Sequence, residues 1–133
     1  MGNALFSKGR EGILDRTIDM TGDVRAMLVK STYVFDDADV FLSDLGAADN
    51  GRSAAFGTKT YAAGVFNAAN TSLVASAAVA CNAIILFQHT GVDGTARLIA
   101  YIDTPASGLP CTPAAGQTVN LNWDTGANKI FKL

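Results

Sequence analysis

From Gly46 onward the chain consists of short apolar runs that are separated by turn residues. Such a texture is typical of short strands, because a packed helix needs a longer run with a period near 3.6. Residues 83–87, AIILF, are apolar at every position, as expected of a central strand covered on both faces. Residues 118–123 alternate apolar and polar, as expected of a half-buried strand. The sequence therefore predicts a mainly β protein, an antiparallel β-sandwich or barrel-like single domain with short N-terminal helical segments.

Turn residues indicate how these strands connect. The heptapeptide 89–95, HTGVDGT, is predicted to join strands 81–88 and 96–103 as a hairpin. Residues 117–123 and 128–133 are predicted to form a second hairpin at the end of the chain, with a turn between them. The segment 104–116 holds all three prolines and is predicted to be an irregular surface loop.

Helical segments are expected before the strands. We predict a helical segment in residues 1–15, with Asn3 as its cap, although Gly9 and Gly12 weaken it. Residues 24–30, VRAMLVK, indicate a strand, and residues 35–45 indicate a second short helix that begins in a group of aspartates. With 133 residues, the whole chain 1–133 is expected to form one domain.

The triplet Asp124-Thr125-Gly126 also occurs in aspartic proteases, where it presents a catalytic carboxylate. Those enzymes need two carboxylates that share a proton, together with a flap over the substrate. Only seven residues follow Gly126, which is enough for one strand. We interpret the triplet as a turn in which Asp124 starts the turn and Gly126 supplies a positive φ.

Other candidate sites lack their partners in the sequence. The single histidine, His89, has no zinc set and no nucleophile motif beside it. The aspartates at 36, 37 and 39 lack the glycine and glutamate of an EF-hand loop, and residues 57–64, GTKTYAAG, lack the end of a P-loop. Cys81 and Cys111 are expected to be two free thiols, although a disulfide between them stays open. We expect no enzyme activity, catalytic residue, cofactor or metal.

Charge and hydropathy exclude two further classes of partner. The net charge is −2 and the ten Lys and Arg residues form no cluster, so direct nucleic-acid binding is not expected. The most apolar segment, residues 73–87, is interrupted by Asn82 and is too short for a membrane helix. No secretion signal is recognised at the N-terminus, and the protein is expected to be soluble.

Several sequence blocks, taken in order, resemble a group of small structural proteins of tailed bacteriophages. The resemblance covers about residues 10–133, and its most specific block is the closing WDTGANKIFKL. The earlier blocks are REGILDRTIDM, VRAMLV, FLSDL, GVFNAAN, RLIAYIDT and GLPCTP.

The resemblance implies a virion protein, and within that class a capsid cement or decoration protein. Its partner would be the major capsid protein or another virion protein, with homo-oligomers possible, and its place would be the virion after assembly in the bacterial cytoplasm. A neck or tail component is the alternative within the class. From the residues alone, a carbohydrate-binding β-sandwich also stays open, with Tyr33, Tyr61, Tyr101 or Trp123 as its aromatic platform. Trp123 and Phe131 are expected to face each other in the core.

Overall fold

The computed structural model describes residues 3–105 and 107–133. Strands predominate, and every strand pair among the described residues is antiparallel, which confirms the predicted mainly β class. The elements are β1 (Ala4–Leu5), α1 (Ser7–Leu14), β2 (Val24–Lys30), η1 (Leu42–Ala48), β3 (Asp49–Arg52), η2 (Ala62–Gly64), β4 (Val65–Phe66), β5 (Thr71–Val74), β6 (Cys81–Gln88), β7 (Leu98–Ile102), β8 (Thr118–Leu121) and β9 (Phe131–Lys132).

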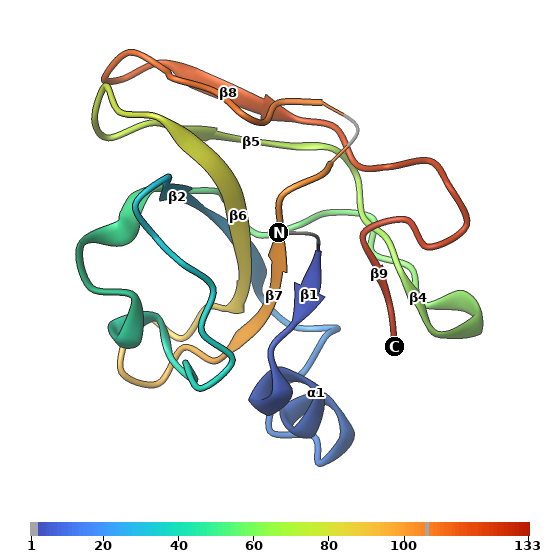
Figure 1. Cartoon of the computed structure of the whole chain (residues 1–133). Coiled ribbons are helices and arrows are strands. Elements are labelled where there is room, and N and C mark those ends of the chain that lie inside the picture. The colour runs from blue at the N-terminus through green and yellow to red at the C-terminus, as the bar shows by residue number, and fades with distance from the viewer. Residues whose placement is uncertain (1–2, 106) are drawn as a thin grey trace.

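The centre of the fold is a five-stranded sheet with the order β1-β7-β6-β2-β3 (Figure 1). Strand β6 pairs with β2 along its length, from Val24 opposite Gln88 to Lys30 opposite Cys81. On its other side β6 pairs with β7, which confirms the hairpin predicted around residues 89–95. The predicted strand at residues 24–30 is also confirmed.

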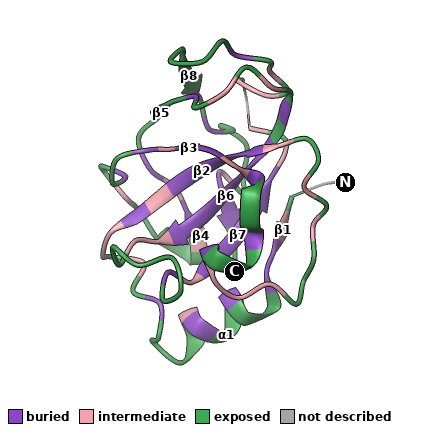
Figure 2. Ribbon diagram, turned by 90° about the vertical axis from the view of Figure 1, so that its left-hand side faces the viewer, coloured by how far each residue is buried: buried purple, intermediate pink, exposed green. Residues whose placement is uncertain are grey.

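Apolar side chains cover both faces of the central strand, as predicted from the run AIILF. Ile84 and Leu86 belong to one buried cluster, and Ile85 and Phe87 belong to the other. All four side chains are fully buried, and Figure 2 shows the buried strands at the centre of the molecule. Because successive side chains of a strand point to opposite faces, an uninterrupted apolar run needs a core on each side.

Two small strand pairs, β5–β8 and β4–β9, complete a sandwich-like arrangement. They pack on the cluster that contains Ile84, because Leu121 of β8 and Phe131 of β9 belong to it. Strand β8 alternates as predicted: Val119 and Leu121 are buried, and the residues between and before them are exposed.

The predicted hairpin between residues 117–123 and 128–133 is wrong. Strand β8 pairs with β5, with Val119 opposite Leu73, and β9 pairs with β4, with Phe131 opposite Phe66. Trp123 and Phe131 are both in the core as predicted, but they do not face each other across a hairpin. The Trp123 ring packs on Phe56 at 5.5 Å between centroids, and the Phe131 ring stacks on Phe66 at 5.2 Å.

The N-terminal segment differs from the prediction in its first residues. Residues 4–5 form an edge strand, and the helix begins only at Ser7. Asn3 does not cap the helix; its side-chain oxygen accepts the backbone N–H groups of Asp103 and Thr104, at 2.9 and 3.1 Å. Gly9 is buried against β7, and a Cβ there would lie 2.6 Å from the backbone oxygen of Ile99. This glycine therefore permits the close packing of α1 on the sheet.

The short helix predicted at residues 35–45 is present only in its last four residues, and its predicted start in the aspartates is wrong. Residues 37–38 form a turn, and the 3₁₀ segment η1 begins only at Leu42. The Asp36 side chain accepts the backbone N–H of Ala38 at 2.9 Å, and this local bond favours a turn over a helix.

The proline-rich segment 104–116 is irregular as predicted in its described part. Within it, the Leu109–Pro110 peptide bond is cis, and Cys111 forms an isolated bridge with Cys81. Among the described residues, the helices are all too short or too polar to cross a membrane.

Candidate interaction surface

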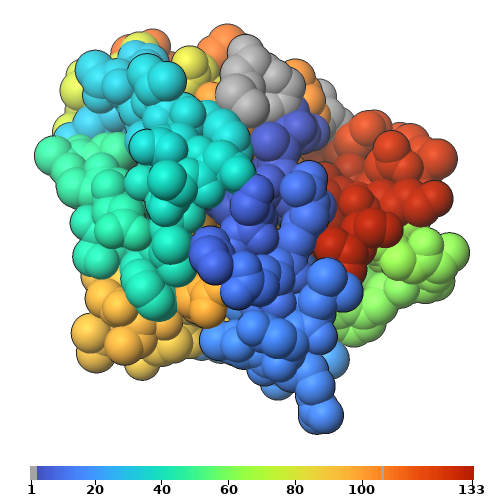
Figure 3. All heavy atoms as spheres, turned by 60° about the horizontal axis from the view of Figure 1, so that its bottom comes forward, coloured from blue at the N-terminus to red at the C-terminus, as the bar shows by residue number. Residues whose placement is uncertain are grey.

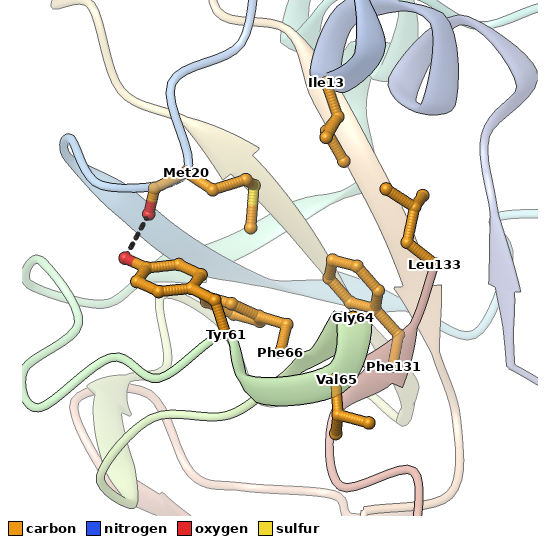
Figure 4. Close-up of a pocket in the computed structure, with 8 residues that line it drawn as sticks. All are labelled: Ile13, Met20, Tyr61, Gly64, Val65, Phe66, Phe131 and Leu133. Atoms are coloured by element: carbon orange, nitrogen blue, oxygen red, sulfur yellow. Dashed lines mark hydrogen bonds between the residues drawn. The ribbon is translucent and has the colours of Figure 1, made fainter.

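An apolar hollow opens where β9 meets the segment that leads into β4 (Figure 4). Its volume is about 200 Å³. Its lining comes from four separate parts of the chain: Ile13 of α1, Met20, residues 61–66 and β9 with its following residue. The lining residues are Ile13, Met20, Tyr61, Gly64, Val65, Phe66, Phe131 and Leu133.

Hydrogen bonds between these segments hold the hollow open. The Tyr61 hydroxyl donates to the backbone oxygen of Met20 at 2.9 Å, which ties the two walls together. Gly64 has a φ of 76°, a left-handed value that glycine adopts without strain, and it turns the chain into β4. Its backbone oxygen accepts the N–H of Leu133 at 3.0 Å, so the C-terminal residues are fixed beside the turn.

The stacked rings of Phe66 and Phe131 form one side of the hollow, with an angle of 30° between their planes. Figure 4 shows the side chains of Ile13, Met20 and Leu133 directed toward the space beside these rings. Leu133 is half exposed, with 49% of its surface accessible, so an apolar group from another molecule can reach the site.

The lining of the hollow is apolar apart from one hydroxyl. Its one side-chain hydroxyl, on Tyr61, is already bonded to Met20. Burial raises the pKa of Tyr61, and the nearby carboxylate of Asp19 raises it further, so the phenol stays neutral. An apolar cavity of about 150 Å³ accepts benzene. The hollow is therefore large enough for one aromatic or branched aliphatic side chain.

The triplet 124–126 forms a turn rather than part of a carboxylate pair. The Asp124 side chain accepts the backbone N–H of Gly126 at 3.0 Å, as in an Asx turn. The predicted positive φ at Gly126 is wrong: the backbone of Gly126 is not in the left-handed region. The left-handed residue of this loop is Lys129, with a φ of 48°.

The three aspartates that suggested a calcium loop serve three separate structural roles. Asp36 accepts from Ala38 and forms a turn. Asp37 accepts the backbone N–H of Ser7 at 2.8 Å and also its hydroxyl. Asp39 accepts the Tyr33 hydroxyl at 2.9 Å. No three His, Cys, Asp or Glu residues in the described ranges are arranged to hold a metal ion.

His89 directly follows β6, Cys81 is the first residue of β6, and Cys111 lies in the loop between β7 and β8. The backbone N–H of His89 donates to the backbone oxygen of Asp23 at 2.8 Å, and the His89 ring packs edge-on against Phe87. Cys81 is buried and Cys111 is half-buried; both are free thiols, as predicted. Their backbones exchange two hydrogen bonds of 2.8 Å, so the two residues lie directly opposite each other.

The aromatic residues considered for a carbohydrate platform are dispersed in the fold. Trp123 and Tyr101 are buried, and Tyr33 packs against Tyr101 at 6.2 Å. Tyr61 is the most exposed of the four, and its ring packs on Phe66 at the edge of the hollow.

Sequence reasoning missed the hollow because no local pattern marks it. Ile13, Met20 and Leu133 belong to separate segments, and they meet only through the tertiary fold. Gly64 is a weak local signal, because a glycine beside apolar residues is compatible with a tight turn.

No family model, curated protein or solved structure matches the chain.

Proposed function

We propose that this chain is a non-enzymatic structural protein of a tailed-bacteriophage virion, a capsid cement or decoration protein that binds and stabilises the shell of the major capsid protein. The observation that carries the proposal is the pre-formed apolar hollow at the surface, bounded by Tyr61, Phe131 and Leu133. Buried pockets that accept an anchoring side chain dominate the energetics of protein interfaces. The order of sequence blocks over residues 10–133 supports the assignment to virion proteins.

A protein of this kind acts through contact area. One side chain of a shell subunit would fill the hollow, and the surrounding surface would exclude water from it. A contact of about 1,600 Å² in total is enough for a stable complex, and contact with several subunits adds avidity. Because such a protein binds the assembled lattice and not its dissociated subunits, it stabilises the lattice by mass action. The protein would then be found in the virion, after assembly in the host cytoplasm.

The test is binding to purified, expanded phage shells that lack the protein. We expect saturation at a fixed number of copies per shell subunit, and a higher melting temperature for decorated shells. The Leu133→Asp variant should bind at least about tenfold more weakly, because a carboxylate at the mouth of the hollow must be desolvated when an apolar side chain enters. Leu14→Asp is the matched control, because Leu14 is 75% exposed and does not line the hollow.

Three results would contradict the proposal. Saturation at about a dozen copies per particle would indicate a neck or tail component, because those positions repeat far less often than shell subunits. Absence of binding to shells, with specific binding to a glycan, would indicate a carbohydrate-binding protein. Equal shell binding by Leu133→Asp and the unmodified protein would remove the hollow from the interface.

A further inference from the structure

Two short strands leave their outer edges open on either side of one groove. Strand β1 is the last strand of the five-stranded sheet beyond β7, and β9 pairs with β4 on one side. Residues of both strands line a groove of about 330 Å³, among them Ala4, Leu5, Phe131 and Lys132. Figure 3 shows the N-terminal and C-terminal segments next to each other at the surface, and Figure 1 shows β1 and β9 running in the same direction.

The hydrogen-bond alternation of β1 determines which of its groups face the groove. The N–H of Phe6 donates to the backbone oxygen of Ile99 in β7 at 3.1 Å, so this pair is hydrogen-bonded. The next residue, Leu5, stands opposite Ala100. Because hydrogen-bonded and non-hydrogen-bonded pairs alternate in an antiparallel ladder, the N–H and C=O of Leu5 point away from β7.

The same reasoning applies to β9. The N–H of Leu133 donates to Gly64 at 3.0 Å, so this pair is hydrogen-bonded. The preceding residue, Lys132, stands opposite Val65, and its N–H and C=O therefore point away from β4. Since Lys132 also lines the groove, a second set of backbone donors and acceptors is available there.

The rim of the groove is positively charged, although the whole chain has a net charge of −2. Arg10, Lys129 and Lys132 line it, together with one acidic residue, Asp124. The ion pairs found within residues 3–105 and 107–133 use none of these three cations. The rim therefore favours a ligand that carries carboxylates.

The geometry points to β-augmentation: the groove between β1 and β9 binds an extended segment of a partner protein that carries Asp or Glu side chains. Such a segment, running antiparallel to β1, would also be antiparallel to β9, because the two strands run in the same direction. It would form hydrogen bonds with the backbone groups of Leu5 on one side and of Lys132 on the other, and would join the two sheets. The partner's identity as a shell protein rests on the proposed function; the binding chemistry does not.

The test uses a synthetic peptide and no phage shells. The probe is an end-capped peptide of about seven residues in which valine alternates with glutamate, a length typical of a strand. Binding is followed by amide chemical shifts and hydrogen exchange of the full chain. We expect slower exchange of the Leu5 and Lys132 amides, by at least about fivefold at saturation. A peptide with lysine in place of glutamate should bind at least about fivefold more weakly.

Two variants separate the backbone contribution from the charge. Lys132→Pro removes the N–H that faces the groove and leaves the bond between Leu133 and Gly64 in place, so it should abolish the protection of Leu5. Lys132→Ala keeps the N–H and should weaken binding only moderately. Lys8→Glu is the charge control, because Lys8 is exposed and lies outside the groove. Unchanged melting temperatures would show that the variants are folded.

The possible results either support or overturn the inference. It is overturned if the glutamate peptide does not bind, if the protected amides lie on another edge such as β3, or if Lys132→Pro binds the peptide normally. It is also overturned if the free protein dimerises through this groove, because the occupant would then be a second copy of the chain. Peptide binding without shell binding would support the inference and contradict the proposed function; shell binding without peptide binding would do the reverse.

Discussion

The carboxylate of Asp37 accepts the backbone N–H of Ser7 at 2.8 Å, and so caps helix α1 from a loop 30 residues further along the chain. The residue before the helix, Phe6, has no side-chain oxygen and makes no such bond. The cap therefore joins the loop 31–41 to α1, and both elements lose a contact if Asp37 is replaced.

The first prediction concerns the pH dependence of this cap. Hydrogen bonds from the hydroxyl and backbone of Ser7 lower the pKa of Asp37 below its ordinary value of 3.8. A carboxyl whose pKa is lower in the folded state stabilises the fold above its unfolded pKa, and this contribution is lost as the pH falls through the folded pKa. We expect Asp37→Ala to lower the free energy of unfolding by about 1 kcal/mol at neutral pH. Urea denaturation should show this difference shrinking as the pH falls below the ordinary carboxyl pKa of 3.8; a difference that does not change with pH would contradict the role.

The second prediction concerns Gly9, which contacts the backbone of β7. Gly9→Ala should destabilise the protein by about 1–3 kcal/mol, although alanine is the better helix former, because the Cβ would clash with the fixed oxygen atoms of Ile99 and Leu98. Gly12→Ala is the graded control: its Cβ would meet the end of the Ile18 side chain, which can move. In thermal unfolding, Gly9→Ala should therefore have a lower melting temperature than Gly12→Ala. The opposite order would be inconsistent with this packing.

The third prediction concerns the last strand. Phe131→Ala should lower the free energy of unfolding by about 3–5 kcal/mol, because it removes a buried ring stacked on Phe66. Lys132→Ala, one residue further on, should change it by less than about 0.5 kcal/mol, because its side chain is exposed. Deletion of residues 128–133 should unfold the domain. A deletion variant that melts at the original temperature would show that β9 is dispensable.

The fourth prediction concerns Asp124. Its side chain accepts one backbone N–H in an exposed turn, and asparagine supplies the same acceptor. Asp124→Asn should therefore leave the melting temperature unchanged. Peptidase activity in the unmodified protein that disappears in Asp124→Asn would restore the protease interpretation of the triplet.

The fifth prediction concerns the two thiols. Burial raises the pKa of Cys111, and the neighbouring Cys81 raises it further, above the ordinary value of 9.0. Because the thiolate is the reactive form, alkylation of Cys111 should be slow at neutral pH and should accelerate about tenfold per pH unit up to its pKa. Mass spectrometry should detect one label under native conditions and two after unfolding, because Cys81 is 1% exposed. Cys111→Ser should lose the native label.

Sequence patterns identify the strands of this fold better than they identify which strands pair with each other. The runs at 24–30, 81–88 and 118–121 are strands because their apolar spacing fits one or two buried faces. The partner of β8 was missed because residues 71–74 and 128–133 are both short runs that can complete its apolar face, and only tertiary packing distinguishes them. A turn between adjacent runs favours a hairpin but does not require one.

The other differences between the expected and the observed structure arise where a side chain forms hydrogen bonds with a segment far from its own in the sequence. Asn3 has the chemistry of a helix cap, yet it accepts the N–H groups of Asp103 and Thr104, and Asp37 takes its place. The hollow and the groove are built in the same way, from single residues of distant segments. No local sequence pattern predicts these contacts between distant segments, because each contact depends on the path of the whole chain.

The pairing of β1 with β7 joins Ala4 to Tyr101, about three quarters of the chain length apart. During synthesis, β1 leaves the ribosome long before the strand that completes it has been made. At about 5–20 residues per second, this delay lasts about 5–20 s, and contacts of such long sequence separation also slow folding itself. Through that interval the first strand is an unpaired edge beside other nascent chains. The order of translation thus leaves β1 waiting longer for its partner than any other paired strand among the described residues.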